Sequence, residues 1–125
     1  DFWVDNDMPI IPMSEVIERG IETCGRKILD RAWNGTEAVY LSWDTDSMDC
    51  SIMPGTSCPE SYGLNARESI AFARLVGEYG VDVFELAELA PIFDVSDISA
   101  KLACNLVYQY LGSRAATLRS QNQAP

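Results

Sequence analysis

The sequence contains no histidine, and this absence excludes several kinds of active site. Histidine is the proton-transfer group of Ser-His-Asp and Cys-His hydrolases, so neither arrangement is available within these 125 residues. Histidine is also the commonest protein ligand of transition metals. Any chemistry that this chain carries alone therefore depends on carboxylates, hydroxyls and thiols.

CxxC cysteine pairs and long apolar runs are also absent, and positively charged residues are few. The four cysteines form no CxxC pair, which argues against a zinc ribbon or a thioredoxin-type site, and we expect a reducing, cytoplasmic environment. Nine basic residues stand against 19 acidic ones, and the net charge of −10 argues against nucleic-acid or anionic-membrane partners. Because no run approaches the roughly 18–20 apolar residues of a membrane span, we expect no membrane segment, and we expect no signal peptide.

Apolar residues recur at helical spacing in some segments and form short continuous runs in others. The spacing predicts helices over 14–33, over 65–79 and from about 96 onward. Strands are predicted over 38–43 and 81–87, with a further short strand around Ile10–Ile11. This alternation predicts an α/β fold with a parallel sheet flanked by helices. The whole chain, 1–125, is interpreted as part of one domain, with a polar, frayed tail over 113–125.

Three carboxylates stand directly behind the strand predicted over 38–43, in the segment YLSWDTDSMD (40–49). Asp44, Asp46 and Asp49 would repel one another unless a positive charge lies among them. Ligands of parallel α/β sheets bind beyond the carboxyl ends of the strands, and Glu88 follows the next predicted strand. We therefore expect Asp44, Asp46 and Glu88 to surround one crevice.

Four interpretations of these aspartates imply different chemistry. An Asp-rich turn that only ends the strand needs no ligand. An EF-hand loop beginning at Asp44 is excluded, because Met48 stands at its fifth position and Gly55 at its twelfth. A haloacid-dehalogenase-type phosphatase shares the DxD motif, but neither Lys27 nor Lys101 is well placed to be its later lysine. In a two-metal hydrolase, carboxylates at i and i+2 bind two divalent ions that polarise a water molecule.

The residues around the aspartates resemble a family signature. The segment AVYLSWDTDSMDCSIMPGTSCPESYGL (38–64) resembles the third signature of the ureohydrolase family, which includes arginase and agmatinase. The matching positions are Ser42, Asp44, Asp46, Asp49, Pro54, Gly55, Thr56, Pro59, Gly63 and Leu64. The segment ELAPIFDVSDISAKLA (88–103) resembles a later stretch of the same family. The resemblance covers essentially the whole chain. It implies a three-layer α/β/α fold with a mainly parallel sheet, of which this chain would be roughly the C-terminal half.

The resemblance also implies a role for each site residue. Asp44 would bridge two divalent metal ions, Mn²⁺ or Ni²⁺, and Asp46 would bind one of them. Asp49 would not bind the metal ions but would orient the loop that carries their ligands. Glu88 would pair with the guanidinium group of a small cationic substrate, and Cys58 stands where a hydroxyl often lines the substrate pocket. The implied reaction is hydrolysis of a guanidino or amidino C–N bond, releasing urea or a related product and an amine or ammonia.

The chain departs from the family pattern in two ways. Cys50, Ser57, Cys58 and Tyr62 replace the usual residues near the substrate, which motivates a smaller or alkylated guanidine as substrate. The G-G-D-H and D-A-H-x-D segments, which carry the family's histidine ligands, are absent. The resemblance therefore implies an N-terminal part of the same enzyme or a companion chain, assembled as a trimer or hexamer, and we expect no turnover from this chain alone. The competing interpretation is a non-catalytic structural subunit of a ureohydrolase-like hetero-oligomer.

Overall fold

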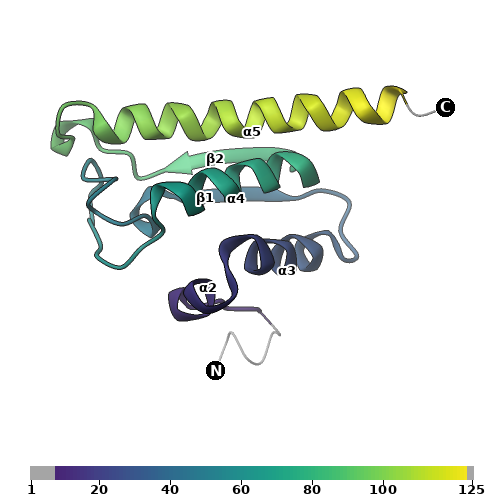
Figure 1. Cartoon of the computed structure of the whole chain (residues 1–125), viewed down its shortest axis with the longest axis horizontal. Helices are drawn as coiled ribbons and strands as arrows, with labels where there is room; N and C mark the ends of the chain where they lie inside the picture. Colours follow the sequence, from purple (N-terminus) through teal and green to yellow (C-terminus); the bar gives the residue numbers. More distant parts are fainter. Residues whose placement is uncertain (1–7, 124–125) are drawn as a thin grey trace.

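The structure, a computed structural model, describes residues 8–123 (Figure 1). In chain order its elements are α2 (Met13–Arg19), α3 (Ile21–Trp33), β1 (Tyr40–Asp44), the 3-10 turn η1 (Thr45–Ser47), α4 (Ala66–Tyr79), β2 (Val83–Ala87), the 3-10 turn η2 (Pro91–Phe93) and α5 (Ile98–Gln123). The two strands pair in parallel, with Asp44 opposite Ala87. The helix α4 therefore forms the crossover that two neighbouring parallel strands require.

Local sequence explains where α4 begins and ends. The side chain of Asn65 accepts hydrogen bonds from the N–H groups of Arg67 and Glu68, and the Glu68 carboxylate accepts one from the N–H of Asn65. This capping box satisfies donors that a helix start otherwise leaves unpaired. Gly80, with φ +75°, ends the helix. The helix predicted over 65–79 is thereby confirmed.

The sheet has one covered face and one bare face, because side chains alternate along each strand. On the covered face Trp43 is buried and meets Phe72 of α4 edge-on, with ring centroids 5.1 Å apart. On the same face Phe84 stacks on Tyr110 of α5 at 4.5 Å. On the opposite face the side chain of Tyr40 remains 59% exposed. Within residues 8–123 the helices thus cover one face, and the outer edge of each strand has no partner strand.

Two apolar clusters form the core. The first lies among α3, α4 and the residues that flank the strands, and its buried members are Leu29, Val39, Leu75, Val76 and Val81. The second lies under the loop that follows β1, and its buried members are Trp43, Met48, Met53, Ala73 and Leu106. Because two methionines of that loop are completely buried, the loop is part of the core rather than a surface appendage.

The helix expected over 14–33 consists of two helices. Gly20, with φ +82°, separates α2 from α3, and the left-handed backbone region is accessible to glycine at little cost. The first of them begins at Met13, with Pro12 as its N-cap. The short strand expected around Ile10–Ile11 is not present, since these residues have no regular secondary structure. Both predictions were wrong.

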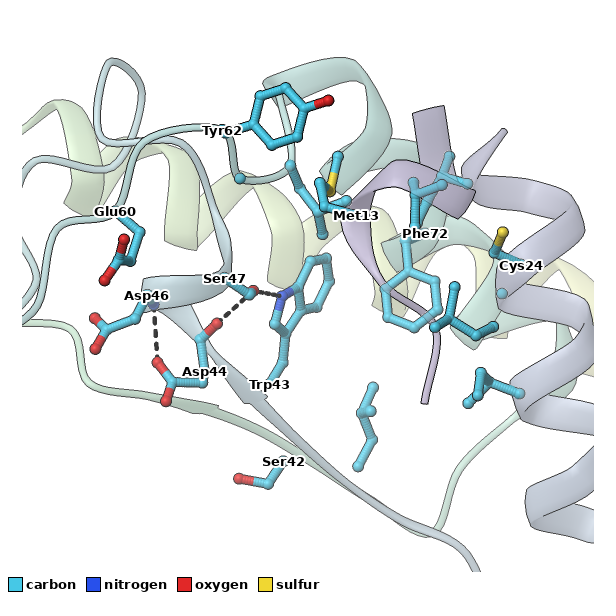
Figure 2. A pocket seen from close by; sticks show the side chains of 18 of the residues that line it. Met13, Cys24, Ser42, Trp43, Asp44, Asp46, Ser47, Glu60, Tyr62 and Phe72 are labelled. Carbon is cyan, nitrogen blue, oxygen red and sulfur yellow. Dashed lines mark hydrogen bonds between the residues drawn. The ribbon is translucent and has the colours of Figure 1, made fainter. Parts of the chain in front are cut away.

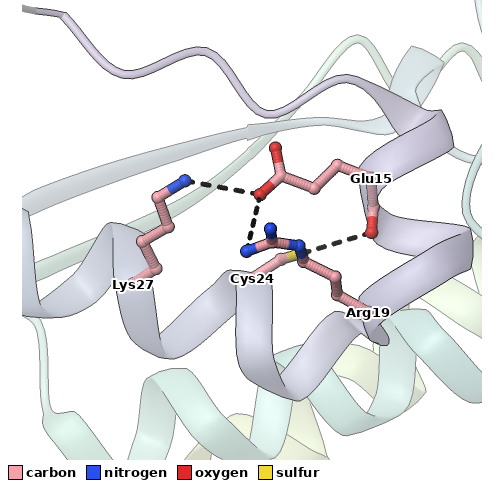
Figure 3. A network of polar contacts seen from close by, with 4 residues as sticks. All are labelled: Glu15, Arg19, Cys24 and Lys27. Atoms are coloured by element: carbon pink, nitrogen blue, oxygen red, sulfur yellow. Dashed lines mark hydrogen bonds and ion pairs between the residues drawn. The ribbon is translucent and has the colours of Figure 1, made fainter.

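A network of polar contacts holds α2 against α3 (Figure 3). The Glu15 carboxylate pairs with Arg19 at 3.6 Å and with Lys27 at 3.3 Å. The Cys24 thiol donates to the carbonyl oxygen of Glu15 at 3.7 Å. Ion pairs at a protein surface contribute about 0–1 kcal/mol, so this network adds only modestly to the packing of α2 on α3.

The last helix extends further than the sequence suggests. A frayed tail is expected over 113–125, yet α5 is helical as far as Gln123, and residues 124–125 lie outside the described range. The Ser113 hydroxyl donates to the carbonyl oxygen of Arg74 at 2.8 Å and ties this part of α5 to α4. The domain bounds 1–125 remain a prediction. Along residues 8–123 no helix has the length and apolarity needed to cross a membrane.

Candidate metal and substrate site

The turn that follows β1 fixes the first two aspartates (Figure 2). The Asp44 carboxylate accepts a hydrogen bond from the N–H of Asp46 at 2.8 Å. The Ser47 hydroxyl donates to the carbonyl oxygen of Asp44 at 2.6 Å and accepts from the indole N–H of Trp43 at 3.0 Å. Since Trp43 is anchored in the core, this chain of hydrogen bonds ties the aspartates to a rigid part of the fold.

Asp46 lies in a concentration of negative charge. Burial raises the pKa of Asp46, and the charges of Asp44, Glu88 and Glu60 raise it further, although the N–H of Cys58 donates to the carboxylate and partly offsets the rise. The Oδ1 atom of Asp46 is buried and has no hydrogen-bond partner. A buried carboxylate oxygen without a donor is unfavourable unless a cation or a further donor approaches it.

Glu88 reaches the same region from the end of β2. Its backbone lies in the left-handed region, with φ 62°, which is uncommon for a residue other than glycine. The Ser57 hydroxyl donates to Oε2 of Glu88 at 2.8 Å. Because β1 and β2 are parallel and in register at Asp44 and Ala87, the acids behind the two strands meet at one edge of the sheet. The structure thus brings together Asp44, Asp46 and Glu88, as the sequence analysis expects.

Asp49 points toward the loop rather than toward the other aspartates. Its Oδ1 accepts hydrogen bonds from the hydroxyl and the N–H of Ser51, and its Oδ2 accepts one from the N–H of Tyr62 at 2.9 Å. The Ser51 hydroxyl, then the N–H groups of Ser51 and Tyr62, lower the pKa of Asp49. Asp49 therefore joins two distant parts of one loop, a placement that suits the supporting role predicted for it.

The comparisons with known proteins identify the family. A model described as the arginase family matches residues 1–112. This chain belongs to the arginase family. The agmatinase of Enterobacter sp. (strain 638) is 28% identical over 116 residues, which are 93% of this chain and 37% of that relative. These findings confirm the resemblance to the ureohydrolase family.

Solved structures agree with that assignment. The arginase of Bacillus caldovelox matches this arginase-family chain with a TM-score of 0.83 and 28% identity, over 89% of this chain and 38% of its own. The proclavaminate amidino hydrolase of Streptomyces clavuligerus matches with a TM-score of 0.82 and 28% identity, over 94% of this chain and 38% of its own. The α/β fold is confirmed, and the chain spans well under half the length of these relatives.

The carboxylates of this arginase-family chain suit divalent cations, but they supply only some of the ligands that a metal centre needs. The buried, unpaired oxygen of Asp46 beside Asp44 is an oxygen-rich environment of the kind that suits Mn²⁺. Within residues 8–123, however, no group of three or more His, Cys, Asp and Glu side chains is arranged to hold a metal ion. A dinuclear centre at Asp44 and Asp46 would therefore need ligands from outside the described residues.

A cavity of about 560 Å³ opens beside the two aspartates (Figure 2). One end is lined by Asp44, Asp46 and Glu60, and Figure 2 shows Phe72 and Cys24 on the opposite side. The remaining wall is mostly apolar and comes from α2, α3, β1 and the loop residues 61–64. The cavity is thus acidic at one end and apolar along its length, and it follows β1 to its carboxyl end.

Sequence reasoning missed Ser57 and Glu60, and the role that it predicts for the side chain of Cys58 stays a prediction. Cys58 is exposed and contributes its backbone N–H to Asp46, whereas the prediction concerned its side chain. Glu60 was missed because a pairing between loop residues 49 and 60, which no local pattern reveals, brings it to the site. Ser57 was missed although it stands beside Cys58 among the departures from the family pattern, and that departure was the available signal.

Proposed function

We propose that this chain is part of a dinuclear-metal-dependent amidinohydrolase, which hydrolyses a guanidino or amidino C–N bond. The observation that carries the proposal is the buried, unpaired Oδ1 of Asp46, which lies in the electrostatic field of Asp44 and Glu88 at one edge of the sheet. The names of the relatives, agmatinase and proclavaminate amidino hydrolase, support the same reaction class.

Each residue has a distinct task in this proposal. Asp44 and Asp46 hold two divalent ions, Mn²⁺ or Ni²⁺, together with ligands from an N-terminal segment or a companion chain. When bound, these ions supply the Lewis acidity that makes water a nucleophile near neutral pH. Glu88 orients the guanidinium group through charge-assisted hydrogen bonds, and Cys58 lines the substrate pocket. Asp49 keeps the loop between them in place.

The proposal includes the cellular and quaternary context. We expect a cytoplasmic enzyme that acts on a small guanidino compound and assembles as a trimer or hexamer. The acidic, partly apolar cavity beside Asp44 accommodates a small cation with an apolar portion, which supports this substrate class.

Metal content and turnover of the complete, metal-loaded protein test the proposal. We expect Asp44→Asn and Asp46→Asn to lose bound metal and to reduce turnover of guanidino substrates by more than the roughly 10–100-fold that is typical of supporting residues, the range expected for Asp49→Asn. Asp97→Asn is the matched control, because Asp97 lies before α5 and its left-handed backbone also suits asparagine. If the wild-type protein binds no metal and shows no turnover, the result would instead support the interpretation as a non-catalytic structural subunit.

A further inference from the structure

The loop that carries Ser57 is joined to the segment that carries Glu88 by a short antiparallel pairing. Thr56 and Leu89 form an antiparallel bridge, and the N–H of Ala90 donates to the carbonyl oxygen of Gly55 at 2.8 Å. Ser57 and Glu88 are the next residues after Thr56 and before Leu89, and the Ser57 hydroxyl donates to Oε2 of Glu88 at 2.8 Å. The backbone pairing of Thr56 with Leu89 therefore places the side chains of Ser57 and Glu88 next to each other.

The far end of this pairing is clamped to α5. The N–H of Gly55 donates to the hydroxyl of Ser99 at 2.7 Å, and Ser99 is completely buried. The Asp94 carboxylate accepts hydrogen bonds from the N–H groups of Ser99 and Ala100 at 3.0 Å each. A Cβ atom at Gly55 would lie 2.7 Å from Cβ of Asp94, so the loop is packed against this turn as closely as a glycine permits. The contacts of Gly55 with Ser99 and Asp94 therefore fix the backbone of the loop two residues before Ser57.

The geometry points to Ser57 as a specificity-determining residue of the guanidinium site, an inference that rests on the function proposed above. Its hydroxyl holds Oε2 of Glu88 in one orientation, so that the carboxylate presents a fixed edge to an incoming guanidinium group. A guanidinium pairs with a carboxylate through two parallel N–H···O bonds, and such pairing depends on the orientation of both planes. Ser57 therefore favours tight, oriented binding of the guanidinium end.

The same hydroxyl restricts what the guanidinium nitrogens can carry. Because the Ser57 Oγ atom lies 2.8 Å from Oε2, an alkyl group on the nitrogen that pairs with Oε2 would have to displace the hydroxyl. A guanidinium whose paired nitrogens carry only hydrogen fits without that displacement. Ser57 thus selects for substrates that are unsubstituted at the end facing Glu88, and a larger substituent has to point away from it.

Three substitutions at Ser57 separate the hydrogen bond from the volume. Ser57→Ala removes the hydroxyl but keeps the Cβ, Ser57→Gly removes both, and Ser57→Thr keeps the hydroxyl. In the complete, metal-loaded protein, we expect Ser57→Ala to lower kcat/KM for a substrate unsubstituted at this end about tenfold, mainly through KM, because a hydrogen bond to a charged group is lost. Ser57→Thr should restore most of that loss. Ser57→Gly should improve the relative kcat/KM of the N-methylated analogue of the same substrate.

Binding and metal content distinguish the possible failures. Calorimetric titration with guanidinium chloride at millimolar concentration should show the same weakening in Ser57→Ala, while metal content stays at the wild-type level. Ser120→Ala is the matched control and should change neither quantity, because the Ser120 hydroxyl lies near the end of α5 and donates to the carbonyl oxygen of Thr117 in the same helix. Equal kcat/KM ratios for the two substrates in wild type, Ser57→Ala and Ser57→Gly would overturn this inference. Absence of turnover and of metal in the wild type would overturn the proposed function instead.

Discussion

Replacing Gly63 by alanine tests how the loop behind the aspartates is built. A Cβ atom at position 63 would lie 2.6 Å from the carbonyl carbon of Met48, 2.7 Å from the nitrogen of Asp49 and 2.7 Å from the carbonyl oxygen of Ser47. All three neighbours are backbone atoms, so no side chain can rotate away. Ordinary contacts begin at 3.4 Å, and the difference from 2.6 Å requires the two segments to separate by about 0.8 Å.

That separation disrupts the hydrogen bonds that join the segments. The N–H of Asp49 donates to the carbonyl oxygen of Leu64 at 3.0 Å, and the N–H of Leu64 donates to that of Ser47 at 2.9 Å. Losing two such bonds costs about 1 kcal/mol each, and overpacking a tight site adds about 1–3 kcal/mol. We therefore expect Gly63→Ala to lower the free energy of unfolding by roughly 3–5 kcal/mol.

Urea unfolding followed by tryptophan fluorescence measures this loss. Gly112→Ala is the matched control, because Gly112 lies inside α5 and its added methyl would have no atom within 4 Å. There the same substitution should raise the free energy of unfolding by up to about 1 kcal/mol, since alanine favours helices over glycine. A change below about 0.5 kcal/mol in Gly63→Ala would refute the idea that backbone contact at Gly63 holds the loop.

Two further predictions concern the core and the pH dependence of stability. Leu106 is completely buried in the cluster beneath the site, so Leu106→Ala should cost about 2–5 kcal/mol in urea unfolding; a loss under 1 kcal/mol would mean that α5 packs differently. The pKa of Asp49 is lowered in the folded chain. Its stabilising effect should therefore be complete above the unfolded value of about 3.9 and disappear as the pH falls through the lower native pKa. In Asp49→Asn the free energy of unfolding should depend less on pH in that acidic range. An unchanged pH dependence would contradict the stabilising role of the Asp49 carboxylate.

Elements that are specified locally were predictable from the sequence. The capping box at Asn65 and Glu68 lies within four residues, and the strands are short apolar runs that end at turn-forming residues. The placement of Asp44 and Asp46 at the carboxyl end of β1 was predictable for the same reason, because Asp44 ends the strand and Asp46 lies in the turn that follows it. Glu88 was found because the alternation of elements predicted a parallel sheet, which places successive strand ends side by side.

Features that depend on tertiary contacts were not predictable. Helical periodicity runs through Gly20, and only the packing of α2 on α3 shows that the helix breaks there. The end of α5 is polar in sequence yet helical, since Ser113 bonds to α4 and the preceding turns are already anchored. Ser57 and Glu60 reach the site through pairings across 31 and 11 residues, for which a single sequence has no periodic signal.

Within residues 8–123 the outer edges of β1 and β2 have no partner strand, and this has a consequence for isolated copies of the chain. An open strand edge presents a row of free backbone donors and acceptors, which recruits strands from other molecules and leads to aggregation. On the bare face of the sheet the ring of Tyr40, a residue that is 59% exposed, adds to that tendency. The net charge of −10 opposes the approach of a second copy. We therefore expect that salt, which screens this repulsion, promotes the association of isolated copies.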